Sequence, residues 1–212
     1  MVRDDRALKI AEFLLQIKAI KLQPGDPFTW ASGWKSPIYC DNRKTLAHPK
    51  IRTFIRQQLA SIIEEKFGKP EVIAGVATAA IAHGVLVAEA LGLPFVYVRP
   101  MPKDHGVGNQ IEGEIKDGQS VVVIEDLIST GSSSLKAVEV LRNAGCDVKG
   151  LAAIFTYDFK LAQESFKKAK CPVASLCNYD VLISKAIETN YVTEKDLKTL
   201  KSWRENPEAW GI

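Results

Sequence analysis

Apolar residues recur at helical spacing in two stretches near the start of the chain, residues 4–20 and residues 49–67. In the first stretch, Ile10, Leu14 and Ile17 fall on one side of a helical wheel, and polar residues occupy the other. This three-to-four-residue spacing is typical of an amphipathic helix with one buried face. Both stretches are therefore predicted to be helices.

Elsewhere the apolar residues form short runs that favour strands. Strands are expected at residues 28–29, 38–40, 72–75, 95–98, 121–124 and 148–156 and near 173–176. Further helices are expected at residues 80–91 and 135–144 and over most of 160–212. Because strands alternate with helices of about a dozen residues after position 70, the pattern predicts right-handed βαβ units. The expected fold class is α/β, with a central, mainly parallel sheet flanked by helices.

The stretch VVVIEDLISTGSSS, residues 121–134, places ionisable groups at the end of a predicted strand. Glu125 and Asp126 follow the apolar run, at the strand end where open α/β sheets bind ligands. A hydroxyl-rich turn and a predicted helix start come next, where backbone N–H groups attract phosphate. The turn residues are Thr130, Gly131, Ser132, Ser133 and Ser134. Two acids beside such a turn favour a binding site for a ligand that carries a sugar diol and a phosphate. The alternative is an ordinary βα turn whose acids are solvated.

A long polar segment interrupts the alternation between residues 99 and 119. It contains two prolines and four glycines, and it lacks apolar periodicity before Ile111. Long loops of this kind inside a compact domain are usually functional lids or disordered excursions. The loop by itself does not decide between these alternatives.

Composition and charge narrow the function classes. The 212 residues carry a net charge of +3, and basic and acidic residues are interleaved, so generic nucleic-acid binding has little support. The cysteines lack the spacing of a zinc site, and they are Cys40, Cys146, Cys171 and Cys177. The first 20 residues do not form a signal peptide, and no apolar segment reaches the length of a membrane span. We expect a soluble, cytoplasmic protein with no membrane or nucleic-acid partner.

Some conspicuous residues have a plainer interpretation as parts of the core. His48 and His83, near two predicted helix starts, are expected to be structural. Trp203 and Trp210, in the C-terminal tail, are expected to pack against the fold instead of stacking on a ligand.

Four segments, in collinear order, resemble the orotate phosphoribosyltransferases of the type I phosphoribosyltransferase family. They are FTWASGWKSPIYCDNR at 28–43, GVATAAIAHG at 75–84, VYVRPMPKDHGVGNQIEG at 96–113 and VVVIEDLISTGSSS at 121–134. The last segment specifies only the superfamily that binds phosphoribosyl pyrophosphate (PRPP). The other segments are more specific, and the resemblance runs from about residue 8 to residue 157.

The resemblance implies transfer of a phosphoribosyl group from PRPP to orotate, which gives orotidine 5′-monophosphate and pyrophosphate. The implied catalytic residues are Arg99, Lys103, His105 and Asp126. PRPP binding is implied for Ala77, Thr78, Arg99, Lys103, His105, Glu125, Asp126, Ser129, Thr130, Gly131, Ser132 and Ser133. Orotate binding is implied for Phe28, Thr29, Ser32, Gly33, Lys35 and Ser129, with the alternative that Lys35 is a solvated side chain.

The resemblance also implies a cofactor, an assembly and a division of the chain. Mg²⁺ is expected to arrive with PRPP, contacting Glu125 and Asp126 at most, with no metal site built from protein side chains alone. A homodimer is implied, with the lid of one subunit reaching the neighbouring PRPP site, and a separate orotidylate decarboxylase is compatible as a partner. The implied units are residues 1–69 with a base-binding hood, a PRPP-binding core at 70–160 and a helical region at 161–212.

Three positions depart from patterns found in some family members. Those members have a lysine where this chain has Ala31, and a lysine where it has Ala79 or Ala80. Others have an arginine shortly after the strand predicted to end near Thr156, where this chain continues with Tyr157, Asp158, Phe159 and Lys160.

Two other functions share part of the signature. A type I transferase for another base would lack the K-D-H-G loop and the F-T-W-x-S-G segment. A PRPP-sensing regulator would lose the lid and add a basic nucleic-acid-binding appendage, and no such appendage is evident in this sequence.

Overall fold

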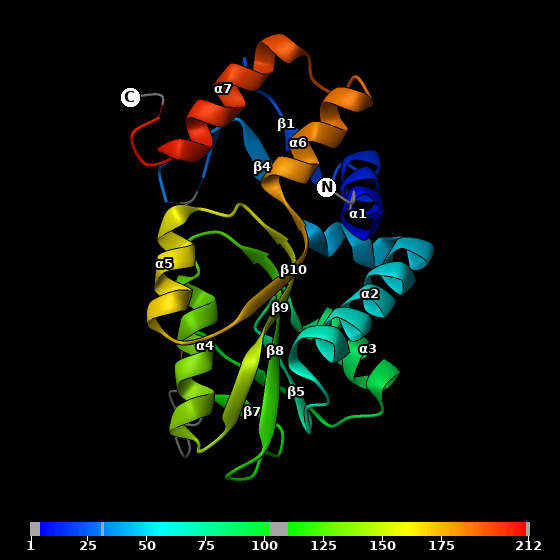
Figure 1. Cartoon of the computed structure of the whole chain (residues 1–212), viewed down its shortest axis with the longest axis vertical. Helices are drawn as coiled ribbons and strands as arrows, with labels where there is room; N and C mark the ends of the chain where they lie inside the picture. Colours follow the sequence, from blue (N-terminus) through cyan, green and yellow to red (C-terminus); the bar gives the residue numbers. More distant parts are fainter. Residues whose placement is uncertain (1–4, 31, 102–109, 211–212) are drawn as a thin grey trace.

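The computed structural model describes residues 5–30, 32–101 and 110–210 and places a six-stranded sheet at the centre of the molecule (Figure 1). The strands lie in the order β10-β9-β8-β5-β6-β7. Their bounds are Val72–Val76 for β5, Phe95–Val98 for β6, Ile111–Glu112 for β7, Ser120–Ile128 for β8, Asp147–Thr156 for β9 and Val173–Asn178 for β10. Neighbouring strands run parallel except β6 and β7, which pair antiparallel. The mainly parallel sheet predicted from the apolar runs is confirmed.

Helices cover both faces of this sheet (Figure 1). On one face lie α2 (Pro49–Phe67) and α3 (Ile81–Leu91), and on the other lie α4 (Ser132–Asn143) and α5 (Lys160–Lys168). The remaining α-helices are α1 (Asp5–Gln16), α6 (Tyr179–Glu188) and α7 (Glu194–Glu205). Because α1 packs against α6 and β10, the first helix of the chain is joined to its C-terminal region.

Two short antiparallel pairs stand beside the main sheet. One pairs β1 (Ile20–Leu22) with β4 (Ile38–Cys40), and the other pairs β2 (Phe28–Thr29) with β3 (Lys35–Ser36). A 3₁₀ helix, η1 (Asn42–Ala47), follows β4 and leads into α2. This segment connects the small strands to the edge of the main sheet.

The central strand β8 is longer than its apolar run predicts. Residues 121–124 have no exposed surface, as expected for a strand covered on both faces. The strand then continues through Glu125 and Asp126 to Ile128, because its partner β9 also continues and Ile128 pairs with Thr156. The prediction that the strand ends before the two acids is therefore wrong, and both acids lie within it.

The first helix is shorter than predicted. It ends at Gln16, and Lys18 has a backbone φ of 53°, a left-handed conformation that stops a helix. The apolar residues that follow form β1, in which Ile20 pairs with Cys40 and Leu22 pairs with Ile38. Pairing across the fold thus decides the conformation of the end of this stretch.

An aromatic cluster joins the C-terminal helices to the small strands. Trp203 of α7 has no exposed surface and packs edge-on against Trp30 and Tyr157. Its indole N–H donates to the backbone oxygen of Lys35 at 3.1 Å, while Trp210 donates to Ser202 Oγ at 3.2 Å. The expectation that the two tail tryptophans pack within the fold is confirmed.

Two expectations remain, one about membrane-spanning helices and one about the division of the chain into units. Within the described ranges, no helix has the length and apolar character needed to cross a membrane. The division into units at 1–69, 70–160 and 161–212 stays a prediction.

Candidate active site

Three loops meet at one edge of the sheet. Strands β8, β5 and β6 are neighbours and run parallel, so the segments that follow them leave the sheet at the same end. These segments contain Ser129 after β8, Thr78 after β5 and Arg99 after β6. The structure thus brings together the residues predicted from three separate motifs, at the edge where open parallel sheets bind ligands.

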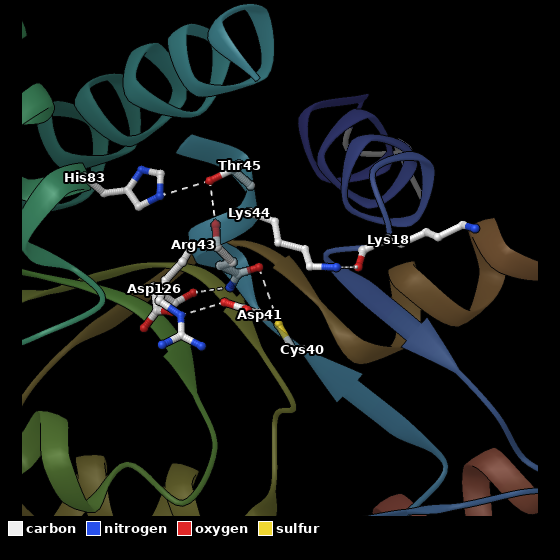
Figure 2. A network of polar contacts seen from close by, with 9 residues as sticks. Lys18, Cys40, Asp41, Arg43, Lys44, Thr45, His83 and Asp126 are labelled. Carbon is white, nitrogen blue, oxygen red and sulfur yellow. Dashed lines mark hydrogen bonds and ion pairs between the residues drawn. The ribbon is translucent and has the colours of Figure 1, made fainter. Parts of the chain in front are cut away.

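The two acids of β8 have different surroundings. Glu125 is only 4% exposed and faces α4, where Ser134 Oγ donates to its Oε2 at 2.8 Å. Its Oε1 accepts the backbone N–H of Asp126 at 3.1 Å. Asp126 is less buried and lies near Arg43, whose positive charge acts on it (Figure 2). Asp126 is therefore the more accessible acid, and Glu125 is held against α4.

Burial acts on both carboxyl groups, and each also responds to its charged neighbours. Burial raises the pKa of Glu125, and the negative charge of Asp126 raises it further. Burial also raises the pKa of Asp126, while hydrogen bonds and the positive charge of Arg43 oppose that shift. A buried carboxylate whose charged form is disfavoured by burial gains from the approach of a cation or of hydroxyl donors.

The loop after β8 leads into the N-terminus of α4. Gly131 has a φ of +79°, and a Cβ at this position would lie 2.7 Å from the ring of Phe166. Glycine is therefore required for the turn that starts α4. The first backbone N–H groups of α4 have no partner within the helix, as at any helix N-terminus. The hydroxyl of Ser134 differs from the expectation for this loop, because it binds Glu125.

The loop between β5 and α3 offers another polar edge. Ala77 donates its backbone N–H to Val98 at 2.9 Å, which fixes the loop against β6. A cis peptide bond joins Ala77 to Thr78, and the side chain of Thr78 is exposed. Thr78 is thus presented to solvent at the sheet edge.

Arg99 stands where the long loop leaves the sheet. Its backbone N–H donates to Gln110 at 2.8 Å, and the Gln110 side chain donates back to the Arg99 carbonyl at 3.2 Å. The buried Nη1 atom has no hydrogen-bond partner among the described residues, and Glu112 Oε1 lies 3.7 Å away. The Arg99 guanidinium is therefore paired with Glu112 at the start of the long loop. Lys103 and His105 lie outside the described residues.

The segment predicted to bind a base is a hairpin. Phe28 pairs with Ser36, and Thr29 pairs with Lys35, whose Nζ donates to Thr29 Oγ1 at 2.8 Å. The turn closes through Gly33, which has a φ of +88°. Ser32 Oγ accepts the backbone N–H of Trp34 at 3.4 Å. Trp30, which comes from the same motif, belongs to the aromatic cluster.

A chain of hydrogen bonds ties η1 to both β8 and α3 (Figure 2). Asn42 Nδ2 donates to the backbone oxygen of Asp126 at 2.6 Å. Thr45 Oγ1 donates to the backbone oxygen of Asn42 at 2.6 Å and lies 3.0 Å from His83 Nε2. The prediction that His83 is structural is confirmed, since it is buried and braces η1.

His83 makes the stability of the fold depend on pH. Burial lowers its pKa from 6.5 to about 4, and the nearby Arg52 charge acts in the same direction. The unfolded chain therefore binds the proton first as the pH falls below about 6.5, and stability is lost towards pH 4. We expect this group to remove about 3 kcal/mol of unfolding free energy over that range. Urea unfolding of the wild type and of His83→Gln at pH 7 and pH 4 should show a smaller loss in the variant. Parallel losses would contradict the prediction.

Comparison with known proteins agrees with this geometry. The phosphoribosyl transferase domain family matches residues 43–186. A protein named orotate phosphoribosyltransferase from Porphyromonas gingivalis is 58% identical over 203 residues, covering 96% of this chain and 97% of its own length. The chain belongs to the orotate phosphoribosyltransferase family.

Solved structures from this family have the same fold. Orotate phosphoribosyltransferase from Aeropyrum pernix superposes with a TM-score of 0.75 at 26% identity, covering 86% of this chain and 99% of that one. The UMP synthase of Leishmania donovani superposes with a TM-score of 0.79 at 25% identity. That match covers 93% of this chain and 42% of the synthase. The expected type I phosphoribosyltransferase fold is thus confirmed.

The structure shows what occupies two of the positions that depart from other members of the family. Ala80 is buried at the start of α3, and Tyr157 is buried in the aromatic cluster, where it packs on Phe159 and Trp203. Ala31 lies outside the described residues.

Sequence reasoning missed the residues of η1 that surround Asp126. Asn42 and Arg43 were part of a recognised motif, but nothing in the local pattern links them to β8. Their only local signal is the polar triplet of Asp41, Asn42 and Arg43 directly after a predicted strand.

Proposed function

We propose that this chain transfers the phosphoribosyl group of PRPP to orotate, giving orotidine 5′-monophosphate and pyrophosphate in pyrimidine biosynthesis. The observation that carries the proposal is the meeting of Asp126, the start of α4 and the Thr78 loop at one sheet edge. These groups match the diol, the 5′-phosphate and the pyrophosphate of PRPP in chemistry. Membership of the orotate phosphoribosyltransferase family supports orotate as the acceptor.

The 5′-phosphate and the pyrophosphate of PRPP bind on opposite sides of the acid pair. The 5′-phosphate accepts hydrogen bonds from backbone N–H groups and hydroxyls of the loop after β8, where the helix dipole adds attraction. The loop residues are Ser129, Thr130, Gly131, Ser132 and Ser133. The pyrophosphate lies against Ala77 and Thr78, with Arg99 as its cation.

The acids hold the ribose ring. Asp126 accepts hydrogen bonds from the ribose hydroxyls, and Glu125 supports it from behind through the hydrogen bond to the Asp126 backbone N–H. As the bond to pyrophosphate breaks, the ring becomes cationic, so the Asp126 carboxylate binds the transition state more strongly than the ground state. Such preorganised electrostatic stabilisation is usually a large part of catalysis.

The pyrophosphate leaving group needs positive charge around it. Arg99, Lys103 and His105 neutralise the negative charge that grows on pyrophosphate, and His105 donates a proton to it. Closure of the loop that carries Lys103 and His105 would exclude water, which otherwise competes with orotate for the activated carbon.

Mg²⁺ is the proposed cofactor, and the residues of the site fit a metal that enters with PRPP. In the described part of the chain, no group of three or more His, Cys, Asp or Glu side chains is arranged to hold a metal. Mg²⁺ commonly binds substrate phosphates and waters with one or two carboxylates. Asp126 would supply the accessible carboxylate, with the buried Glu125 behind it, and the bound ion would neutralise pyrophosphate charge.

Orotate binds under the hairpin. Phe28 covers the ring, while Thr29, Ser32, Gly33 and Ser129 offer hydroxyl and backbone groups to its polar edges. Lys35 adds a positive charge on the same hairpin, although its Nζ already donates to Thr29.

The oligomeric state and the cellular location are proposed by analogy with the family. We propose a cytoplasmic homodimer in which the lid of each subunit completes the neighbouring PRPP site, without membrane or nucleic-acid partners. Its product passes to a separate orotidylate decarboxylase. Light scattering should give twice the mass of one chain.

A spectrophotometric assay tests the activity directly. Orotate absorbance should fall when PRPP and Mg²⁺ are added to the purified protein, and it should return when excess pyrophosphate drives the reverse reaction. Adenine and hypoxanthine serve as matched acceptor controls. Transfer to one of these bases without transfer to orotate would contradict the proposal and favour a transferase for another base.

A further inference from the structure

Arg43 is an exposed cation near Asp126, the more accessible acid of β8. It is the second residue of η1, and its side chain is 63% exposed. The guanidinium lies next to Asp126 in Figure 2, within the hydrogen-bonded segment that joins η1 to β8. Its charge acts on Asp126, and its exposure leaves it accessible to an anionic ligand.

Asp41 orients this guanidinium and leaves most of it free to bind. Arg43 Nε donates to Asp41 Oδ1 at 2.7 Å, and Asp41 is itself fixed through its backbone N–H, which donates to Ala19 at 2.8 Å. Within the described part of the chain, this is the one hydrogen bond of the Arg43 side chain. Its two NH₂ groups therefore remain available, in the planar arrangement that matches a carboxylate.

Hydrogen bonds of the residues on both sides of Arg43 fix the backbone of η1. Asn42 is bonded to the carbonyl of Asp126, while Thr45 is bonded to Asn42 and to His83 of α3. The position of the guanidinium relative to the acid is thus set before any ligand arrives. Preorganisation of this kind increases affinity because less conformational freedom is lost on binding.

The position of Arg43 points to one anionic group. Tyr39 of β4 packs against Phe28 with ring centroids 5.6 Å apart, and Arg43 is the third residue after β4 ends. The segment that contacts the proposed base site thus continues to Arg43, whose positive charge acts on Asp126. In orotate, the carboxylate is attached to the carbon next to the nitrogen that attacks the ribose. That carboxylate must lie close to the ribose when the new bond forms.

We propose that Arg43 determines specificity by binding the carboxylate of orotate, with Asp41 as its positioning residue. The proposal rests on the proposed orotate transfer and names the cation that recognises the acceptor. It also accounts for the absence of the lysine and arginine that other family members have at Ala31 and near Tyr157. An anionic acceptor would otherwise approach two carboxylates with little compensation.

The chain offers a matched control in the next residue. Lys44 carries the same charge, but its Nζ donates to the backbone oxygen of Lys18 at 3.2 Å and points away from Asp126 (Figure 2). Arg43→Gln and Lys44→Gln therefore remove equal charge from the same short helix at different distances from the site.

The test compares orotate with uracil, which is the same ring without the carboxylate. The orotate KM and the inhibition constant of uracil against orotate are measured for the wild type and both variants. For Arg43→Gln we expect the orotate KM to rise about 10- to 100-fold, as for loss of a hydrogen bond to a charged group. The uracil inhibition constant and the PRPP KM should stay within about twofold. Arg43→Lys should recover part of the orotate affinity, and Asp41→Asn should lose part of it.

Two results would overturn the assignment. One is an orotate KM in Arg43→Gln that matches Lys44→Gln. The other is a rise confined to the PRPP KM, which would assign the cation to PRPP. Failure of the wild type to use orotate is a separate outcome, because it would refute the proposed function itself. Thermal unfolding of each variant confirms that the fold is intact.

Discussion

Replacing Asp126 with Asn should lower kcat about 100- to 1000-fold, the range seen when a preorganised electrostatic contact to a transition state is removed. The neutral amide keeps the shape of the side chain but loses the charge that favours the cationic ribose ring. The Asp126 backbone oxygen still accepts from Asn42, so the tie to η1 is unaffected. The unfolding free energy should therefore stay close to the wild-type value.

Glu125→Gln is the matched comparison for this variant. Glu125 is buried, its two oxygens already accept hydrogen bonds, and burial raises its pKa, so the amide resembles its protonated form. We expect a loss of kcat well below that of Asp126→Asn, because the substitution removes no charge that faces the ligand. In the double variant, calorimetric titration should show weaker PRPP binding. Unchanged PRPP affinity and unchanged kcat in the double variant would mean that the acids do not hold the ribose.

Replacing Lys103 with Ala should lower kcat about 100-fold or more, because the lost charge acts on the departing pyrophosphate. The effect should appear in kcat more than in the orotate KM, since orotate does not contact this charge. Rapid-quench single-turnover measurements can locate the loss in the chemical step. An equal loss of kcat and thermal stability would contradict this role and assign Lys103 to the fold.

The same variant tests the proposed dimer with shared sites. When inactive Lys103→Ala and inactive Asp126→Asn proteins are mixed and allowed to exchange subunits, some heterodimers form. One site in each heterodimer combines an intact Lys103 with an intact Asp126, so part of the activity should return. Exchange is verified by mass spectrometry, and a mixture of wild type with Asp126→Asn serves as the reference. Confirmed exchange without recovery would refute the shared site.

Local sequence patterns predict best the bounds of elements that depend only on their own residues. The helix α2 and the strand β6 have the predicted bounds, because an amphipathic repeat or an apolar run is bounded by glycine and proline. The two-residue strands β3 and β7 were not predicted. They contain too few residues for a pattern and exist because β2 and β6 lie beside them.

The sequence by itself determined the order of the elements, the acid pair and the glycine turn before α4, because these depend on neighbouring residues. Only the tertiary structure decided that β8 continues through the acids, since that extension requires β9 alongside it. It also decided that Glu125 is braced by Ser134 while Asp126 faces Arg43, because these contacts join residues from separate elements. Contacts between distant parts of the chain cannot be deduced from local periodicity, and here they set the charge around the site.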